Sequence, residues 1–192
     1  MSRPDAPDPR DSLELHALFA RLHAGDPEAA RQAARELARH PDVVVVSACL
    51  LGERVRYDGG DKLDQNVVAR TQGRSILPLC PEMLAGLGTP RPAIHFAKGD
   101  GAALLDGQGA ALAVDEQGRD AGAALLRGAA WAAELAALAG ARRAILKERS
   151  PSCGLLQIHS ARGIAPGRGC FAARLVRAGL VVENEQGQKN QP

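Results

Sequence analysis

Four cysteines carry the most distinctive chemistry in this sequence, and three of them share one kind of setting. Cys49 ends the run VVVVSAC, Cys80 ends SILPLC, and Cys153 follows AILKERSPS. Apolar runs rich in β-branched residues are typical of strands buried on both faces of a parallel sheet. Ligand sites form at the carboxyl edge of such sheets. We therefore expect the three thiols to converge on one crevice.

Three converging thiols are compatible with three kinds of site. A zinc ion needs a fourth protein ligand in a structural site, or one open position in a catalytic site. An iron–sulfur cluster held by three cysteines leaves one iron free for a substrate. A single nucleophilic cysteine with a base is the metal-free alternative. No histidine lies next to the three segments in sequence, and only His95 and His159 are expected to approach. The spacing alone does not choose between these sites.

Composition and charge argue against several classes of protein. The 192 residues are 45% hydrophobic, which is enough to build the core of one domain. The formal net charge is +2 with Lys and Arg spread along the chain, so no nucleic-acid partner is expected. No apolar run approaches the roughly 20 residues of a membrane span, and MSRPDAPDPRDS lacks the apolar stretch of a secretion signal. We expect a cytoplasmic protein with no membrane partner.

The N-terminal 40 residues differ in pattern from the rest. Residues 1–11 are rich in Pro and Asp and are expected to form a disordered tail. Residues 12–40 have helical periodicity, which Gly25, Asp26 and Pro27 interrupt, with Asp26 placed to cap a second helix. This pattern predicts an added helical hairpin. Its three histidines are expected at the surface: His16, His23 and His40.

From residue 42 to 184, predicted strands and helices alternate. Strands are expected near 42–52, 74–80, 142–148 and 180–185, and helices over 65–73, 120–141 and 167–179. A β-hairpin is expected between about 100 and 118, with its turn at Asp106-Gly107. Residues 185–192 read as a polar tail. The alternation predicts an α/β fold of three layers around a mainly parallel sheet.

Five motifs, in order along the chain, resemble the TudS-like thiouracil desulfidase family, also known as domain-of-unknown-function family 523. They are SACLLGERVRYDGG, LCPEM, GTPRP, LKERSPSCG and PGRGCFAARLVRAGL, and the resemblance covers about residues 42–184. The resemblance implies a Rossmann-like fold and a 4Fe–4S cluster held by Cys49, Cys80 and Cys153. It further implies an open fourth iron that takes sulfur from a thiolated uracil without net redox change.

The resemblance also implies roles for other residues of these motifs. Glu82 and Ser150 are expected to be the catalytic pair, although a helix-start acid and a loop cap are the structural alternatives. Arg56, Tyr57 and Asp58 are expected to form a substrate-facing loop, or else a turn through Asp58-Gly59. Arg91 is expected either to meet the carbonyl groups of the substrate ring or to pair with a carboxylate.

The remaining residues of these motifs are expected to be structural, and three positions depart from the family. Lys147, Glu148 and Arg149 are expected to form ion pairs at the end of their strand. Val55 replaces a cysteine that many relatives carry, so that position is not expected to ligate metal. Cys170 and Phe171 stand where relatives have an aliphatic residue and Thr. Cys170 is expected to pack rather than to serve as a fourth ligand, and Phe171 affects substrate choice only if it lines the pocket.

These inferences predict non-redox desulfuration of a thiolated pyrimidine such as 2-thiouracil, giving the oxo base and sulfide. The expected partner is therefore a small thiolated base, and the expected cofactor is the 4Fe–4S cluster. One alternative is a non-enzymatic module whose pocket binds a metal or a nucleobase. The other is a metal-free cysteine hydrolase, which would need one of the three thiols.

Overall fold

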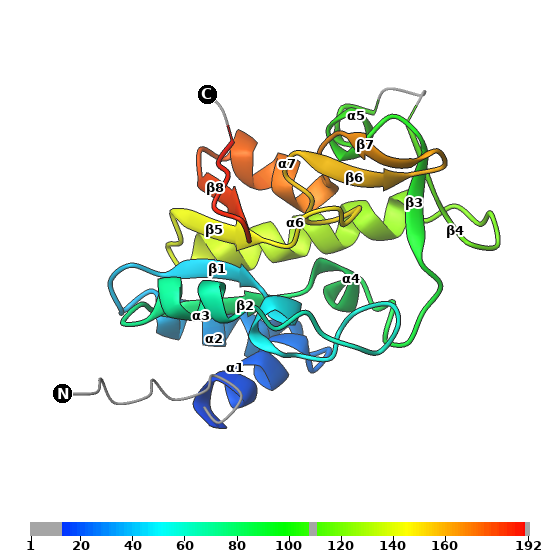
Figure 1. Cartoon of the computed structure of the whole chain (residues 1–192). Helices are drawn as coiled ribbons and strands as arrows, with labels where there is room; N and C mark the ends of the chain where they lie inside the picture. The colour runs from blue at the N-terminus through cyan, green and yellow to red at the C-terminus, as the bar shows by residue number, and fades with distance from the viewer. Residues whose placement is uncertain (1–12, 108–110, 191–192) are drawn as a thin grey trace.

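Strand β1 (Val44–Ser47) lies inside a four-stranded parallel sheet with the order β2-β1-β5-β8 (Figure 1). The structure is a computed structural model that describes residues 13–107 and 111–190. Strand β1 pairs on one side with β2 (Ile76–Leu79) and on the other with β5 (Arg143–Leu146). Strand β8 (Val181–Asn184) then pairs with β5. All four strands were predicted from their β-branched and aliphatic residues.

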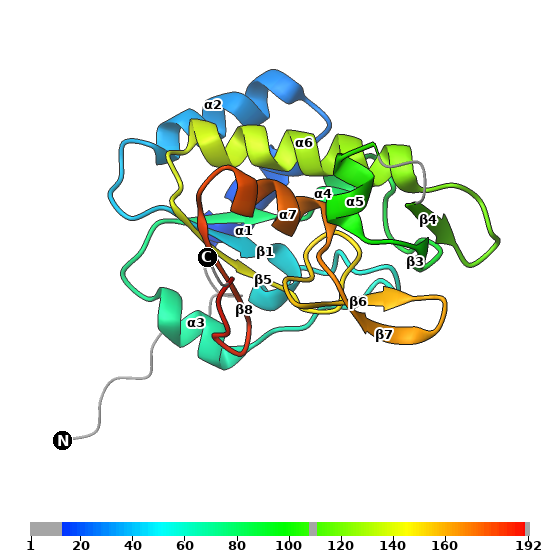
Figure 2. The same ribbon diagram turned by 90° about the horizontal axis from the view of Figure 1, so that it is seen from above.

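Helices cover both faces of this sheet, as the view from above shows (Figure 2). Helices α2 (Pro27–Leu37), α6 (Gly122–Leu138) and α7 (Cys170–Arg177) pack over the larger apolar core on one face. Helix α3 (Gln65–Thr71) and the 3-10 turn η2 (Ala48–Leu51) close a smaller core on the other. Val45 of β1 belongs to the larger core, whereas Val44 and Val46 belong to the smaller one. The predicted three-layer α/β class is therefore confirmed.

The predicted N-terminal hairpin is present as α1 (Leu13–His23) and α2. Asp26 caps α2 by accepting hydrogen bonds from the backbone N–H groups of Glu28 and Ala29, at 3.0 and 3.1 Å. Leu22, Ala33 and Ala34 are buried in the larger core. The hairpin is thus part of the folded core. The tail predicted for residues 1–11 lies outside the described residues.

A second sheet has the order β4-β3-β6-β7 and lies beside the first (Figure 1). Its strands are β3 (Ile94–Lys98), β4 (Leu112–Asp115), β6 (Gln157–Ser160) and β7 (Gly163–Pro166). Strand β3 pairs antiparallel with β4 and parallel with β6, and β6 pairs antiparallel with β7. This sheet was not predicted, because its short strands contain few β-branched residues.

The hairpin predicted between residues 100 and 118 is wrong. The chain forms helix α5 (Gly101–Leu105) where the first strand of the hairpin was predicted, and β4 pairs with β3, which precedes that helix. The Asp100 carboxylate caps α5 by accepting from the N–H of Ala103 at 2.9 Å. A Cβ on Gly101 would lie 2.3 Å from the backbone nitrogen of Cys170, so α5 packs directly on the start of α7. Local alternation could not reveal this tertiary contact.

None of the helices in residues 13–107 and 111–190 combines the length and the apolar character needed to cross a membrane.

Candidate functional site

A cavity of about 480 Å³ opens at the carboxyl edge of the parallel sheet. Cys49 reaches it from η2 after β1, Cys80 from the end of β2, and Cys153 from the loop after β5. The chain turns to opposite sides of β1 to form β2 and β5, so the site lies at a topological switch point of the sheet. The structure brings the three thiols predicted to converge into one cavity.

Burial is the main influence on these thiols. It raises the pKa of Cys49 to about 12 and that of Cys80 to about 11, and it raises the pKa of Cys153 well above its ordinary value. Negative charge on Cys80 would raise the pKa of both Cys49 and Cys153 further. Without a metal, the three groups are therefore neutral thiols.

The three sulfurs surround the cavity and do not meet at one point. Among the residues that the structure describes, no three His, Cys, Asp or Glu side chains are placed to hold a single metal ion together. A 4Fe–4S cluster makes a different demand, because each cysteine binds a different iron of a larger body. The chemistry of the donors also fits, since soft thiolates are the ligands that such clusters use.

Glu82 is the acidic residue of the short helix α4 (Pro81–Leu84), which begins directly after Cys80. Its Oε2 accepts from Nε and Nη2 of Arg91 at 2.9 and 2.7 Å, and its Oε1 accepts from Oγ of Ser152 at 2.9 Å. The side chain of Arg91 is only 6% exposed. Arg91 therefore pairs with a carboxylate in this structure, which was one of its two predicted roles.

Ser150 lines the same cavity and organises the loop that carries Cys153. Its Oγ accepts from the backbone N–H groups of Ser152 and Cys153, both at 3.1 Å. Because the oxygen accepts both bonds, its own hydrogen remains available to donate. Ser150 is therefore a loop cap whose hydroxyl also borders the cavity.

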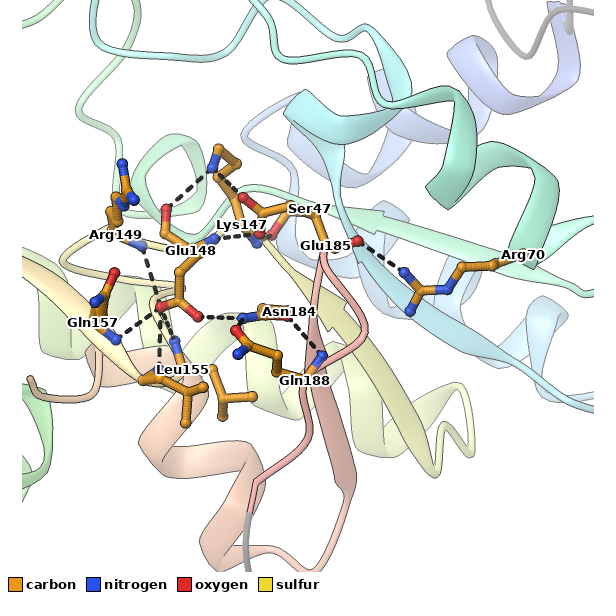
Figure 3. Close-up of polar contacts among 11 residues, drawn as sticks. Ser47, Arg70, Lys147, Glu148, Arg149, Leu155, Gln157, Asn184, Glu185 and Gln188 are labelled. Carbon is orange, nitrogen blue, oxygen red and sulfur yellow. Dashed lines mark hydrogen bonds and ion pairs between the residues drawn. The ribbon is translucent and has the colours of Figure 1, made fainter.

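Glu148 is the buried centre of the hydrogen-bond network that shapes this loop (Figure 3). Its Oε1 accepts from the backbone N–H groups of Leu155, Leu156 and Gln157 at 2.9–3.1 Å, and its Oε2 accepts from Nδ2 of Asn184 at 2.7 Å. Burial alone would raise the pKa of Glu148, but these hydrogen bonds outweigh it and hold the pKa below its usual range. The carboxylate thus acts as an anchor for the turn.

Of the ion pairs predicted at the strand end, the described part of the chain shows that of Lys147 and none for Glu148 or Arg149. Lys147 pairs with Glu185, whose other oxygen accepts from the N–H of Glu148 at 2.7 Å (Figure 3). Glu148 accepts from backbone N–H groups, and Arg149 contributes its own backbone N–H to this network. Glu185 belongs to the segment predicted as a polar tail, yet it is only 8% exposed.

The predicted substrate loop divides into two parts. Arg56 and Tyr57 line the cavity, and the Arg56 guanidinium lies 5.3 Å from the centre of the Tyr57 ring. Asp58 instead accepts from the N–H of Gly60 at 3.0 Å and pairs with Arg56 at 3.4 Å. This segment is therefore both a structural turn and, through two of its residues, a wall of the cavity.

Three predicted departures from the family have definite places. Val55 lines the cavity, so an apolar side chain occupies the position where many relatives carry cysteine. Cys170 and Phe171 are both fully buried in the larger core and are not among the cavity-lining residues. Burial raises the pKa of Cys170 to about 12. Neither residue is placed to contact a molecule in the cavity.

Comparison with known proteins gives the family. Residues 44–187 match the family model of 2-thiouracil desulfurase. The chain belongs to the 2-thiouracil desulfurase family. It is 34% identical over 149 residues to the uncharacterised protein YbbK of Bacillus subtilis (strain 168), covering 74% of this chain and 97% of YbbK. It also resembles the solved 4Fe–4S-dependent thiouracil desulfidase TudS, with 38% identity and a TM-score of 0.62 over 76% of this chain and 91% of that one. The resemblance inferred from the five motifs is thus confirmed.

Two residues of this 2-thiouracil desulfurase family member make contacts at the site that were not predicted from the sequence. Ser152 lies within KERSPSCG but was given no role, and only the fold places its hydroxyl against Glu82. His23 was expected at the surface, yet it is half-buried and its Nε2 accepts from the backbone N–H of Cys80 at 3.1 Å. Because 57 residues separate His23 from Cys80, local sequence patterns contain no signal for this contact.

Proposed function

We propose that this protein is a 4Fe–4S-dependent desulfidase that converts a thiolated pyrimidine such as 2-thiouracil into the oxo base and sulfide. The observation that carries the proposal is the cavity that is lined by the three cysteines and by Glu82. Membership of the 2-thiouracil desulfurase family and the likeness to TudS support an enzyme that acts on carbon–sulfur bonds.

Cys49, Cys80 and Cys153 are the residues that would hold the cluster. They must lose their protons when metal binds. Arg56 and Lys147 favour the anionic form of Cys49, because their positive charges lower its pKa against the effect of burial. When bound, a cluster with one iron free of cysteine supplies a thiophilic Lewis acid that polarises the C–S bond.

The overall reaction exchanges sulfur for oxygen without a change in oxidation state. One water molecule provides the oxygen that bonds to the ring carbon, the C–S bond breaks, and both protons of the water leave with sulfur as hydrogen sulfide. The protein must therefore take a proton from water and return one to sulfur. Glu82 and Ser150 are the two groups that we assign to this proton transfer, as a general base and a hydroxyl donor.

The contacts of Glu82 leave it able to act as a base. A carboxylate has about four acceptor sites, and three donors from Arg91 and Ser152 occupy three of them. Within residues 13–107 and 111–190, Oε1 accepts from Ser152 alone and so keeps one site for a water proton. Arg91 would thus act on the reaction by orienting Glu82, while Arg56 and Tyr57 would contact the ring of the substrate from the opposite loop.

A metal-free cysteine hydrolase is less well supported. A nucleophilic cysteine needs a depressed pKa, because the thiolate is the reactive form. Burial raises the pKa of all four cysteines in this chain. A zinc-binding module is also less well supported, because the three thiols are spread around a cavity and Glu82 is held beside them.

The decisive experiment is anaerobic reconstitution with iron and sulfide, followed by assay of sulfide release from 2-thiouracil. We expect absorbance near 400 nm and turnover in the wild type. Cys49→Ser, Cys80→Ser and Cys153→Ser should each abolish both, because losing one thiolate exposes an iron. Cys170→Ser is the matched control and should keep both, at a cost of about 1 kcal/mol in stability. A colourless but folded wild type, or bleaching by Cys170→Ser, would contradict the proposal.

A further inference from the structure

The N-terminal hairpin lies before the part of the chain that matches the family, which begins at residue 44, yet it contacts the site directly. We propose that His23 is a positioning residue that fixes the backbone of Cys80 and thereby orients its sulfur toward the cluster. The inference rests on the proposed function, because it takes Cys80 to be a cluster ligand.

The hydrogen bonds of His23 define its chemical form. Nδ1 lies 2.9 Å from the carbonyl oxygen of Phe19, so this nitrogen must carry the proton and donate it. Nε2 faces the N–H of Cys80 at 3.1 Å, so this nitrogen must be the acceptor. The ring is therefore neutral and in one tautomer. It also stacks on the Phe19 ring at a centroid distance of 4.1 Å.

The backbone N–H of Cys80 needs a hydrogen-bond acceptor from outside the sheet. The pairing of β1 with β2 ends at Ser47 and Leu79, so Cys80 is the first residue beyond the ladder. Its N–H donates to His23. On its other side Pro81 restricts the backbone of the residue that precedes it. His23 and Pro81 together thus hold both peptide groups of Cys80, which sets the direction of its Cα–Cβ bond.

The rest of α1 holds the helix in place for this contact. Leu22 is buried in the larger core, and Leu15 packs against the smaller core. His16 lies seven residues before His23, on the same face of the helix, and contacts Glu53 at 3.0 Å. Since the side chain of His16 is 70% exposed, this second contact contributes little. The orienting effect belongs to His23.

The test compares four variants with the wild type after anaerobic reconstitution. His23→Leu removes the acceptor. His23→Gln and His23→Asn are both polar amides, but only Gln is long enough to place an oxygen near the position of Nε2. His40→Leu is the control, because His40 is an exposed histidine beyond the other end of the hairpin. The measurements are the rate of absorbance loss near 400 nm in chelator and the visible circular-dichroism bands, which report the arrangement of the cysteine ligands.

We expect His23→Leu and His23→Asn to lose the cluster roughly ten- to hundredfold faster than the wild type and to shift the visible circular-dichroism bands. His23→Gln should restore most of the wild-type rate, and His40→Leu should match the wild type. If His23→Leu fails to fold, the comparison of Gln with Asn still decides. If Gln and Asn gave the same rate of cluster loss and the same circular-dichroism bands, the role of His23 would be overturned and the proposed function would stand. A wild type that takes up no cluster would overturn the proposed function as well.

Discussion

Glu82, the proposed general base, is held by two different kinds of donor. Arg91 donates two N–H hydrogen bonds to Oε2. Ser152 donates one hydrogen bond to Oε1, the oxygen that we assign to proton transfer. A hydrogen bond to a charged group contributes about 1.5–3 kcal/mol. Ser152 should therefore set the direction of Oε1, while Arg91 neutralises the charge of the carboxylate and should matter more to the fold.

We predict that Ser152→Ala keeps the absorbance of the cluster but lowers kcat roughly ten- to hundredfold, because Oε1 loses its orientation. Anaerobic sulfide-release kinetics measure this effect. Thr71→Val is the control, since it removes another buried hydroxyl, which donates to backbone carbonyls of its own helix α3. Unchanged turnover in Ser152→Ala would show that Glu82 does not need this contact.

Arg91 should be essential to the fold of the site. Its ion pair with Glu82 is nearly buried, and removing one member of such a pair leaves an uncompensated charge. We predict that Arg91→Ala lowers the free energy of unfolding by about 3 kcal/mol, measured by urea denaturation of the apoprotein. Arg119→Ala is the control, because Arg119 pairs with Asp115 through a side chain that is 68% exposed. A loss of activity without a loss of stability would instead assign Arg91 to substrate contact.

Glu148 should make the stability of the fold depend on pH. A carboxylate whose pKa is lower in the folded state stabilises the fold above its unfolded pKa, roughly 4.3. That contribution is lost as the pH falls through the folded pKa. We predict that Glu148→Gln costs about 2 kcal/mol at pH 7, because the amide N–H₂ would face Nδ2 of Asn184, and that the difference from the wild type shrinks below about pH 4. Urea denaturation across this range tests it, and a constant difference would refute it.

The sequence identified side chains better than it identified their partners. The positions of the cysteines after apolar runs indicated a shared site, because the carboxyl ends of parallel strands share one edge. The partners of Glu82 and Glu148 could not be predicted in the same way. Asn184 reaches Glu148 only because β8 pairs with β5, and a pairing between strands 38 residues apart leaves no local pattern. Arg91 is the exception, since pairing with a carboxylate was one of its two predicted roles.

Among the elements, strands rich in Val, Ile and Leu were predicted and the others were not. The four strands of the parallel sheet are buried on both faces, which demands continuous apolar residues. By contrast, β6 (QIHS) and β7 (GIAP) contain one β-branched residue each and form through tertiary pairing. The second sheet nevertheless supplies Ile94, His95, His159 and Ser160 to the cavity wall. An element that was invisible in the sequence thus completes the site.

Helix α6 packs closely against α4 at Gly128. Ala normally stabilises a helix interior by about 1 kcal/mol relative to Gly. At Gly128 of α6, however, a Cβ would lie 2.1 Å from the carbonyl oxygen of Pro81, so α4 would have to move. We predict that Gly128→Ala lowers the free energy of unfolding by about 1–3 kcal/mol and speeds loss of the cluster, because Pro81 adjoins Cys80. Thermal unfolding and bleaching rates test this, with Ala137→Ser on the exposed face of α6 as the control.

In the molecule as a whole, the apolar cores and the candidate site are built from different parts of the chain. The two apolar cores lie between the parallel sheet and its helices. The cavity instead collects segments from both sheets, from η2 and from the loops that follow β1, β2 and β5. Hydrogen bonds such as those of Glu148 and Ser150 link the backbone within the loop that carries Cys153. Because the cavity is built from loops and the apolar cores are not, we expect metal binding to matter more to the order of these loops than to the fold.

We predict that removing the cluster by anaerobic chelation leaves the far-ultraviolet circular-dichroism spectrum unchanged. Stability should nevertheless fall, because a ligand that binds only the folded state adds about 3–4 kcal/mol when it is present at 100–1,000 times its dissociation constant. Hydrogen exchange followed by mass spectrometry should show faster exchange in residues 48–62, 80–92 and 147–156, whereas β1, β5 and α6 stay protected. The Cys170→Ser variant should show the same local pattern, since Cys170 lies in the core and away from the cavity. Global loss of secondary structure on chelation would mean that folding itself depends on the metal, as in small zinc domains.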